Sequence, residues 1–476
     1  MREKFYITTA IDYVNAPPHL GHALEKVQAD AIARYQRLLG KEVYFLTGTD
    51  EHGIKIVQSA QNANKTIEEF SQKNTAKFRE LIKQLNISND DFIRTSDQKR
   101  HWPGAQKLWK ELVKTGDIYK SKYQGYYCVG CEAYITEKDL INGKCPYHEK
   151  EPELIEEENY FFRLSKYANQ IKKEITSNRL IISPKTRKNE VLAMFERRIE
   201  DISFSRPREK LNWGVPVPED DSQIIYVWCD ALSNYISALG YGSNDDSNFK
   251  KYWPADIHIV GKDILRFHAI IWPGMLLSIG IDLPKRILVH GFILSEGKRM
   301  SKTLGNVIDP FDLIKEYGTD ALRYYLLREV TLFEDGDITL VKFQDAYNAN
   351  LANGLGNLVN RIMKMSEQNV KHSVLNILRL GTDVEYRKLM DNFELSKALD
   401  LVWVKISELD LRIQATQPFK LIKTDKNKAE KIIRDLIFNL AEIAFLLKPF
   451  LPETSDKILK AIELNKMPPP LFLRKE

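Results

Sequence analysis

The first fifty residues hold two β-rich runs separated by one helical run. They read KFYITTAIDYV at 4–14, NAPP at 15–18, HLGHALEKVQADAIARYQRLLG at 19–40 and EVYFLTGTD at 42–50. This order of strand, proline turn, helix and strand predicts the start of a parallel α/β sheet. Ligands of such sheets lie beyond the carboxyl ends of the strands, where residues 19–22 and TGTDEHG at 47–53 both fall.

Length and composition limit the class of protein. A chain of 476 residues is too long for one core, so about two to four domains are expected. The hydrophobic fraction of 43% and charged fraction of 28% are typical of folded globular chains, and the net charge of +5 permits a nucleic-acid partner without requiring one. No signal-peptide core opens the sequence, and no apolar run reaches the roughly 18 residues of a membrane span. We expect a cytoplasmic enzyme without membrane contact.

The rest of the chain changes character along its length. From residue 118 to about 213, short runs, scattered aromatics and cysteines predict an inserted domain. The α/β pattern returns with QIIYVWCDALSNYI at 223–236 and DIHIVGKDILRFHAIIWPGML at 256–276. From about residue 340 the apolar residues recur with helical periodicity, as in SKALDLVWVKISELDLRI at 396–413, which predicts a helix bundle.

Two histidines and a glycine stand at the start of the first predicted helix. His19 and His22, on either side of Gly21, can place both rings at one side of a helix N-terminus, whose free N–H groups favour anions. Gly21 would let a ligand approach the backbone closely. An isolated H-x-x-H is more often a helix start with capping or surface histidines, so the pair alone is a weak sign of a phosphate site.

A second segment strengthens that hypothesis. GKRMSKTLGN at 297–306 carries Lys298, Arg299 and Lys302 in a loop of small polar residues. Such a loop could close over a polyphosphate and stabilise charge in a transition state, although a lone basic loop is more often simply solvated. The two segments together are more specific than either alone, and we expect the histidine pair and Lys302 to meet around one triphosphate.

Four residues have the spacing of a metal site. Cys128, Cys131, Cys145 and His148 form C-x2-C, a 13-residue spacer and C-x2-H. Two paired ligand turns suit tetrahedral zinc, and four protein ligands leave no open position, so one structural zinc per chain is predicted. The alternative is a set of buried free cysteines. Cys229 is expected in a strand, as a core residue.

These motifs resemble a known family. PHLGH at 18–22 resembles the HIGH motif of class I aminoacyl-tRNA synthetases, and RMSKT at 299–303 resembles their KMSKS loop, with Arg299 and Thr303 departing from the usual spelling. Further segments resemble methionyl-tRNA synthetases of the bacterial type with a single zinc knuckle, over nearly the whole chain: FLTGTDEHG, KNEVLAM, ISFSRP, NWGVPVP, YVWCDALSNY, IVGKDILRFHAIIWPGML, TLGNVIDP, YGTDALRYYLLRE and LGNLVNR.

The resemblance implies a fold and its division into domains. The fold would be an α/β Rossmann-like parallel-sheet catalytic domain with a zinc-binding insertion, followed by an all-α anticodon-binding helix bundle. The expected bounds are 1–117 and 223–290 for the two catalytic halves, 118–222 for the insertion, 291–345 for a stem-contact segment with the KMSKS-like loop, and 346–476 for the anticodon-binding domain.

The resemblance also assigns site residues. Methionine would be bound by Ile11, Tyr13, Asp50, Trp228, Tyr235, His268 and Trp272. ATP would be bound by His19, Gly21, His22, Gly261, Asp263 and Lys302, of which His19, His22 and Lys302 would be catalytic. Asp50 would pair with the amino group, and aromatic ring edges suit a polarisable thioether. Anticodon candidates are Asn357, Arg361 and Phe419.

The implied activity is that of a methionine–tRNA ligase serving translation initiation and elongation. The carboxylate of L-methionine would attack the α-phosphorus of Mg-ATP, pyrophosphate would leave, and tRNA(Met) would then take methionine from the adenylate. A monomer is expected, since the chain ends soon after its helices. In DLRIQATQPFK at 410–420, Asp410 and Phe419 depart from the family's N-x-Y-I and P-W spelling. Asp410 would bring negative charge near RNA.

Two alternatives remain open at this point. One is a class I synthetase for cysteine or for a branched aliphatic amino acid. The other is a zinc-knuckle RNA-binding or chaperone module without catalysis. The amino acid that supports ATP–pyrophosphate exchange would decide between the synthetases, and loss of exchange on mutating His22 or Lys302 would exclude the binding module.

Overall fold

The computed structural model describes residues 2–135, 137, 140–146, 149–300, 307–370 and 383–476. Its contacts divide the chain into two units. The first unit comprises Met1–Pro18, Glu42–Glu80 and Asn89–His290, and the second comprises His19–Lys41, Leu81–Ser88 and Gly291–Glu476. Among the described residues, no helix combines the length and the apolar character that crossing a membrane would require.

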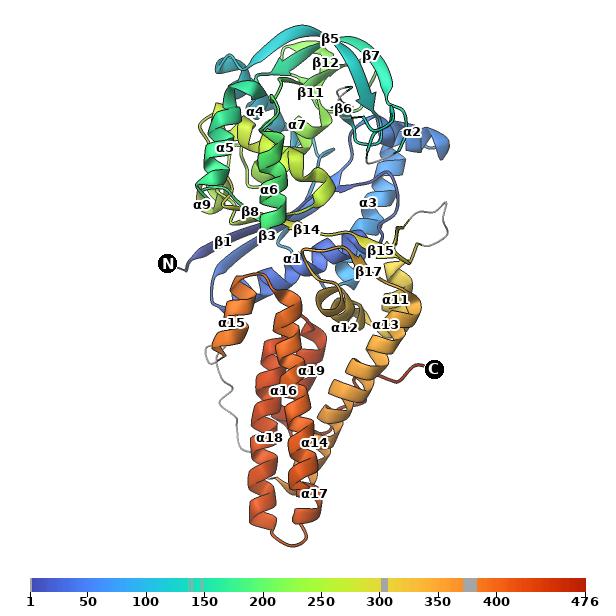
Figure 1. Ribbon diagram of the computed structural model, residues 1–476, viewed down its shortest axis with the longest axis vertical. Helices are drawn as coiled ribbons and strands as arrows, with labels where there is room; N and C mark the ends of the chain where they lie inside the picture. The colour runs from blue at the N-terminus through green and yellow to red at the C-terminus, as the bar shows by residue number, and fades with distance from the viewer. Residues whose placement is uncertain (1, 136, 138–139, 147–148, 301–306, 371–382) are drawn as a thin grey trace. The chain divides into compact units, whose positions relative to one another are not determined.

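The largest sheet of the first unit is parallel throughout, which confirms the predicted α/β class (Figure 1). Its order is β2-β3-β1-β13-β14-β8, and β4 pairs with β3. The strands are β1 (Lys4–Thr9), β2 (Asp12–Tyr13), β3 (Glu42–Asp50), β4 (Asp91–Arg94), β8 (Ile181–Ser183), β13 (Ile257–Gly261) and β14 (Arg286–His290). All five residues of β13 are buried, as expected for a parallel strand covered on both faces.

Helices of the first unit follow these strands in the chain. They are α2 (Ile54–Asn62), α3 (Ile67–Gln84, its last turn in the second unit), α4 (Trp102–Lys114), α5 (Ala168–Thr176), α6 (Lys185–Met194), α7 (Val227–Leu232), α8 (Asn234–Ser237), α9 (Ser247–Tyr252), α10 (Trp272–Ser278), and the shorter turns Leu164–Tyr167, Lys262–Ile264 and Phe267–Ile271. Proline stands in the first turn of α4 and of α10, where its missing N–H costs no hydrogen bond.

The region predicted as an insertion contains antiparallel sheets. One has the order β6-β5-β7-β9 and the other the order β10-β12-β11. Their strands are β5 (Ile118–Cys128), β6 (Ala133–Ile135), β7 (Glu153–Phe162), β9 (Ile202–Ser203), β10 (Ser205–Pro207), β11 (Pro216–Val217) and β12 (Asp220–Ile225). Between β7 and β9 in the chain, β8 pairs with β14 at the edge of the parallel sheet.

One sequence expectation fails here. The run at 223–236 was expected to resume the parallel pattern with Cys229 in a strand, but its strand is β12 of the antiparallel sheet, and α7 begins at Val227. The Asp230 N–H donates to the carbonyl of Tyr226 at 3.0 Å, which starts helical bonding where the β-branched and aromatic composition of YVWC favours a strand. Cys229 is buried, as predicted, but in a helix.

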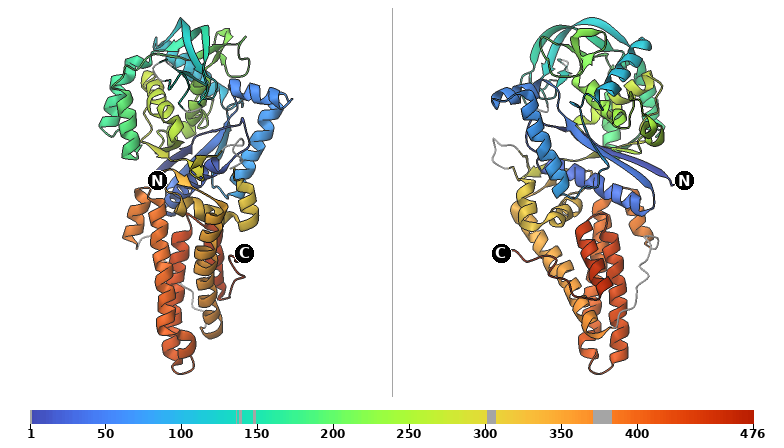
Figure 2. Two further views of the ribbon diagram at one scale, coloured as in Figure 1. Left: turned by 45° about the vertical axis from the view of Figure 1, so that its right-hand side comes forward. Right: turned by 180° about the vertical axis from the view of Figure 1, so that it is seen from behind.

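The second unit contains a helix bundle, as predicted, and the small sheet β16-β15-β17. Its elements are α1 (Leu20–Leu38), β15 (Ile293–Ser295), β16 (Lys298–Arg299), α11 (Pro310–Tyr317), α12 (Thr319–Tyr324), the π-helical turn Tyr325–Glu329, β17 (Gly336–Asp337), α13 (Leu340–Ala346), the π-helical segment Tyr347–Gly356, α14 (Asn357–Asn369), α15 (Val384–Asp391), α16 (Leu395–Thr416), α17 (Pro418–Leu421), α18 (Lys426–Leu447) and α19 (Pro452–Leu464). Helix α18 packs against α14, α16, α17 and α19 (Figure 2).

Helix α1 belongs to the second unit, although it lies between β2 and β3 in the chain. It contacts β15 and the π-helical turn Tyr325–Glu329. Its buried face includes polar residues, among them Glu25, Gln28 and Asp30. The helix that carries the histidine pair is therefore part of the same unit as the bundle.

Candidate active site

The seven residues predicted for methionine all lie in the first unit, and we refer to them as the methionine cluster. They are Ile11, Tyr13, Asp50, Trp228, Tyr235, His268 and Trp272. One hydrophobic core holds Tyr235 and Trp272, with Ile11 and Trp228 packed against it. The Trp228 ring stacks on Phe267, with centroids 3.7 Å apart, and stays half-buried. Trp272 is fully buried, so it forms part of the packing behind Tyr235.

Hydrogen bonds orient the polar members of the methionine cluster. The Tyr235 hydroxyl lies 2.8 Å from His268 Nε2, and His268 Nδ1 lies 2.9 Å from the carbonyl oxygen of Ile264. Because a carbonyl only accepts, Nδ1 carries the proton of His268 and the Tyr235 hydroxyl donates to Nε2. The Tyr6 hydroxyl donates to the carbonyl of Tyr235 at 2.7 Å. Both rings are therefore held in one orientation.

Asp50 supplies the carboxylate of the cluster at the carboxyl end of β3. It is the register partner of Tyr13 in the β2–β3 pair. Its Oδ1 accepts from the N–H of His52 and from the hydroxyl of Thr95, each at 3.2 Å. Burial, reinforced by the charge of Asp230, raises the pKa of Asp50 to about 8. Since both donors bind Oδ1, Oδ2 is the oxygen that can meet a ligand.

A buried chain of charged groups lies beside Asp50. The Asp230 oxygens lie 2.6 Å from His52 Nδ1 and 2.6 Å from His101 Nε2, and His101 Nδ1 lies 2.8 Å from the Ser237 hydroxyl. Burial would raise the pKa of Asp230, but the charge of His52 and the bonds from both histidines lower it. Burial would lower the pKa of His52, but the charge of Asp230 raises it. The two side chains thus form a buried ion pair.

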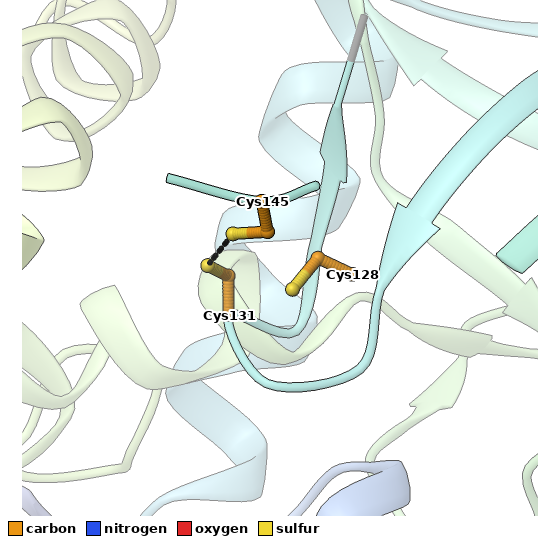
Figure 3. Close-up of side chains that lie close together, drawn as sticks. All are labelled: Cys128, Cys131 and Cys145. Atoms are coloured by element: carbon orange, nitrogen blue, oxygen red, sulfur yellow. Dashed lines mark hydrogen bonds between the residues drawn. The ribbon is translucent and has the colours of Figure 1, made fainter. Parts of the chain in front are cut away.

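Three of the four predicted zinc ligands come together (Figure 3). The sulfur atoms of Cys128, Cys131 and Cys145 all lie within 4.8 Å of one another, and the last two are 3.5 Å apart. Cys128 ends β5, and the C-x2-C turn leads from it toward β6. These thiols could hold a metal ion. His148 lies outside the described residues.

The C-x2-C turn also contacts the methionine cluster. The indole N–H of Trp228 donates to the carbonyl oxygen of Cys131 at 3.3 Å, and the Tyr13 hydroxyl donates to Glu132 Oε1 at 2.8 Å. The same Oε1 accepts from the N–H of Lys55 at 2.6 Å. Gly53 lies against this pair: its φ is +105°, and a Cβ there would come within 2.6 Å of the Tyr13 hydroxyl oxygen. The cysteine turn and the methionine cluster are thus directly hydrogen-bonded.

Three of the predicted nucleotide residues, His19, Gly21 and His22, stand at the N-terminus of α1. At the start of α1, Nδ1 of His19 accepts from the N–H of Gly21, and Nδ1 of His22 accepts from the N–H of His19, both at 3.1 Å. The ring centroids are 3.9 Å apart. Because Nδ1 accepts in each ring, the neutral imidazoles carry their proton on Nε2. A Cβ on Gly21 would lie 2.9 Å from the His19 ring, so glycine makes room for that ring.

The remaining nucleotide candidates are less fully described. Gly261 ends β13 in the first unit, and Asp263 is exposed in the turn that follows it. Lys302 lies outside the described residues, so its meeting with the histidine pair stays a prediction.

The predicted anticodon residues lie on the bundle. Asn357 is exposed at the first position of α14, and Phe419 is 48% exposed in α17. Arg361 forms an ion pair with Asp410 of α16, and the Gln414 side chain donates to the other carboxylate oxygen at 2.6 Å. The acidic residue that departs from the family spelling is therefore paired with a predicted RNA-binding arginine.

Comparison with known proteins decides the family. A family model described as tRNA synthetases class I (M) matches residues 5–153 and 137–363, and one described as the anticodon binding domain of methionyl tRNA ligase matches residues 368–471. The chain belongs to the methionyl-tRNA synthetase family.

Individual relatives agree with this assignment. The methionine–tRNA ligase of Thermotoga maritima is 41% identical over 98% of this chain and 76% of its own length, and that of Brucella suis is 42% identical over 96% and 91%. The structure of Mycobacterium tuberculosis methionyl-tRNA synthetase in complex with methionyl-adenylate is 35% identical, covers both chains fully and has a TM-score of 0.91. The predicted activity, a methionine–tRNA ligase, is confirmed, and the synthetases for other amino acids and the non-catalytic module are rejected.

Some residues that contact or lie beside the methionine cluster of this synthetase were not found from its sequence. Glu132 follows a predicted ligand, yet nothing in its neighbours indicates a bond to Tyr13. The Asp230 carboxylate joins His52 and His101 across 178 and 129 positions of the chain. Phe267 stacks on Trp228 in the structure. In the sequence, its position next to the predicted His268 is what could have indicated it.

Proposed function

We propose that the methionine cluster binds the amino acid, with Asp50 as the anchor of its ammonium group. The observation that carries this assignment is a buried carboxylate, in register with Tyr13, whose two protein donors both bind Oδ1 and leave Oδ2 to a ligand. Burial and the charge of Asp230 raise the pKa of Asp50 despite the nearby charge of His52, so a further cation would stabilise the ionised carboxylate. A bound ammonium would supply it.

The side chain of methionine would be selected by the aromatic members. Trp228 is half-buried and stacked, and Tyr235 and His268 are locked by their mutual hydrogen bond. Polarisable sulfur packs favourably at ring edges. A hydrophobic site separates amino acids that differ by one methylene by only about 10–200-fold, so the fixed orientation of these rings matters for selectivity.

For the nucleotide, we assign Mg-ATP binding to His19, Gly21, His22, Gly261, Asp263 and Lys302. The tautomers found in α1 direct two Nε2–H donors away from the helix cap, which suits phosphate oxygens at a helix N-terminus. Mg²⁺ would neutralise phosphate charge. The methionine carboxylate, already ionised, would attack the α-phosphorus without a general base, while His19, His22 and Lys302 stabilise the developing charge.

The second step needs the terminal hydroxyl of tRNA(Met), which attacks the carbonyl of methionyl-adenylate and releases AMP. We assign anticodon contacts to Asn357, Arg361 and Phe419, of which the exposed ring of Phe419 suits base stacking. Cys128, Cys131, Cys145 and His148 would hold one structural zinc. We also propose that the enzyme is cytoplasmic and monomeric. Sedimentation of the purified chain tests the oligomeric state.

The assignment of the amino-acid site is tested by ATP–pyrophosphate exchange. The wild-type chain should exchange with methionine and not with cysteine, isoleucine, leucine or valine. Asp50→Asn should raise the KM for methionine at least about tenfold, because a charge-assisted bond is lost. Asp221→Asn, a change at an exposed carboxylate of the same unit, is the matched control and should leave KM unchanged. Equal KM values for Asp50→Asn and the control would overturn the assignment.

A further inference from the structure

A buried charged cluster holds helix α1 in the second unit, apart from the residues assigned above. At its centre, Arg323 Nη2 lies 2.7 Å from Asp30 Oδ2, and neither side chain has any exposed surface. Asp30 is on the same helix as His19 and His22, about two to three turns further along. Arg323 lies in α12.

The same guanidinium also holds the bundle. Its Nε donates to the carbonyl of Phe450 at 2.7 Å, and its Nη2 donates to the carbonyl of Pro449 at 3.1 Å. These two residues form the turn between α18 and α19. Arg323 Nη1 donates to the carbonyl of Leu85 at 3.0 Å. One side chain therefore joins α1 to the α18–α19 turn through its fixed planar fork.

Both carboxylate oxygens of Asp30, the partner of Arg323, also accept hydrogen bonds from other groups. Asp30 Oδ1 accepts from the N–H of Ser88 at 2.7 Å and from its hydroxyl at 2.6 Å, and Oδ2 accepts from Arg34 Nε at 2.7 Å. Burial would raise the pKa of Asp30, but the charges of Arg323 and Arg34 lower it. The pair is therefore ionised and saturated with donors.

A second contact joins the far end of α1 to the bundle. The Tyr35 hydroxyl donates to Asp391 Oδ1 of α15 at 2.8 Å, and its ring meets Tyr386 edge to face. Tyr386 in turn donates to the carbonyl of Leu446, near the end of α18, at 2.7 Å. Both contacts thus lead from α1 to the C-terminal end of α18.

Stability alone does not account for such a cluster. Apolar side chains of similar volume often stabilise a core as well as a buried ion pair does. What the charged pair adds is geometry, because a guanidinium with three carbonyls and a carboxylate around it accepts only one register of the helices. Any shift of the α18–α19 turn must move Arg323, α1 or both.

We propose that Arg323 is a positioning residue, which holds α1 in register with the α18–α19 turn through its ion pair with Asp30. Because His19 and His22 lie at the start of α1, tRNA bound to the bundle then alters the rate of methionyl-adenylate formation. The proposal rests on the function assigned above to His19 and His22. Where bound tRNA changes the affinity of α1 for ATP, linkage requires that ATP change the affinity of the bundle for tRNA by the same factor.

Arg323→Lys tests the positioning, because lysine keeps the charge but cannot span the four acceptors. ATP–pyrophosphate exchange should show a kcat about tenfold lower and a raised KM for ATP, with the KM for methionine within about twofold, because methionine is assigned to the first unit. The matched control is Arg328→Lys, five residues further on, whose side chain binds Asp400 and Tyr324 rather than α1. It should leave all three constants unchanged.

Two further measurements keep the outcomes distinct. Tyr35→Phe removes a single hydroxyl and should lower kcat about two- to fourfold in a fully folded protein, which serves if Arg323→Lys does not fold. Adding tRNA(Met) with an oxidised terminal ribose, which cannot accept methionine, should change the KM for ATP of the wild type at least twofold and that of the Arg323 or Tyr35 variant less.

The proposal is overturned if folded Arg323→Lys or Tyr35→Phe keeps wild-type kcat, or if the oxidised tRNA leaves the wild-type KM for ATP unchanged. A lower melting temperature with unchanged kcat would show a purely structural role. His22→Asn separates failure of the proposed histidine function from failure of the positioning role. If His22→Asn leaves exchange intact, the assignment of the histidines fails. If exchange is slow in His22→Asn but normal in Arg323→Lys, only the positioning role of Arg323 is rejected.

Discussion

Trp228 donates its indole N–H to the carbonyl oxygen of Cys131, so a residue of the methionine cluster is bonded to the backbone of one of the three clustered cysteines. The Tyr13 hydroxyl donates to the side-chain carboxylate of Glu132, the next residue of the chain. If the three clustered thiols hold the proposed zinc, this C-x2-C turn links the metal to the proposed amino-acid site.

Removal of the metal should weaken methionine binding before it abolishes folding of the first unit. Treatment with a strong chelator should raise the KM for methionine about five- to tenfold, since two hydrogen bonds of about 0.5–1.5 kcal/mol each lose their geometry. Metal content by mass spectrometry should fall from one zinc per chain, and added Zn²⁺ should restore the KM. Unchanged methionine binding in the metal-free protein would contradict this support.

Substitutions at Glu132 test the hydrogen bond from Tyr13 separately from the metal. Glu132→Gln keeps an acceptor for the Tyr13 hydroxyl and should retain a KM for methionine within about twofold. Glu132→Ala removes the acceptor of the Tyr13 hydroxyl, the Lys55 N–H and the Tyr127 hydroxyl. Of these three bonds only that from Tyr13 reaches the methionine cluster, and its loss should raise that KM about three- to tenfold. Equal constants for the two variants, measured by exchange, would show that the contact to Tyr13 does not matter.

Methionine binding should release a proton near neutral pH. With a pKa of about 8, Asp50 is mostly protonated at pH 7, and an ammonium pairs with the ionised form. Binding should then release about 0.9 proton at pH 7, and the KM should fall nearly tenfold for each pH unit from 6 to 7. Calorimetry in two buffers of different ionisation enthalpy measures the proton directly. Asp50→Asn should bind weakly without this release, and proton-neutral binding by the wild type would refute the assignment.

The hydrogen bond between Tyr235 and His268 should affect methionine and not ATP. Tyr235→Phe leaves the ring stack on His258 in place but removes the donor to His268 Nε2. The KM for methionine should rise about three- to tenfold, with the KM for ATP unchanged. Tyr241→Phe, at a buried tyrosine of the same unit, is the control. A parallel rise in both KM values would indicate general loosening of the fold instead.

Substitutions at His22 should separate helix capping from catalysis. An asparagine amide reaches the position of Nδ1 and can accept from the N–H of His19, whereas glutamine reaches the position of Nε2. His22→Asn should keep the melting temperature yet lower exchange kcat about 10²–10³-fold, the cost of one transition-state donor. His22→Gln should lose less activity and more stability. The reverse order of the two variants would mean that the ring serves only as a cap.

Much of the fold follows from local signals. The apolar runs of β1 and β3 around the proline turn predicted a parallel sheet, and the helical periodicity within α16 predicted the bundle. Both patterns depend only on residues that are close in the sequence. The three clustered cysteines were found in the same way, since their spacing makes two local turns.

The remainder depends on contacts between distant parts of the chain. The Asp230 carboxylate contacts His52 and His101 only when three distant segments of the chain pack together. No spacing in the sequence indicates these contacts. In the second unit, Asp30 of α1 pairs with Arg323, nearly three hundred positions further along the chain. Cys229 was assigned to a strand because its neighbours favour one, and the backbone bond to Tyr226 outweighs that preference.

Gly53, whose φ is positive and which lies against the side chains of Tyr13 and Glu132, limits redesign of this enzyme. Engineering for bulkier amino-acid analogues usually proceeds by randomising positions around a substrate, but any side chain at Gly53 would strike the tyrosine hydroxyl and strain the backbone at once. Libraries that leave residue 53 fixed, and vary half-buried positions such as Ile11 instead, should retain far more folded members.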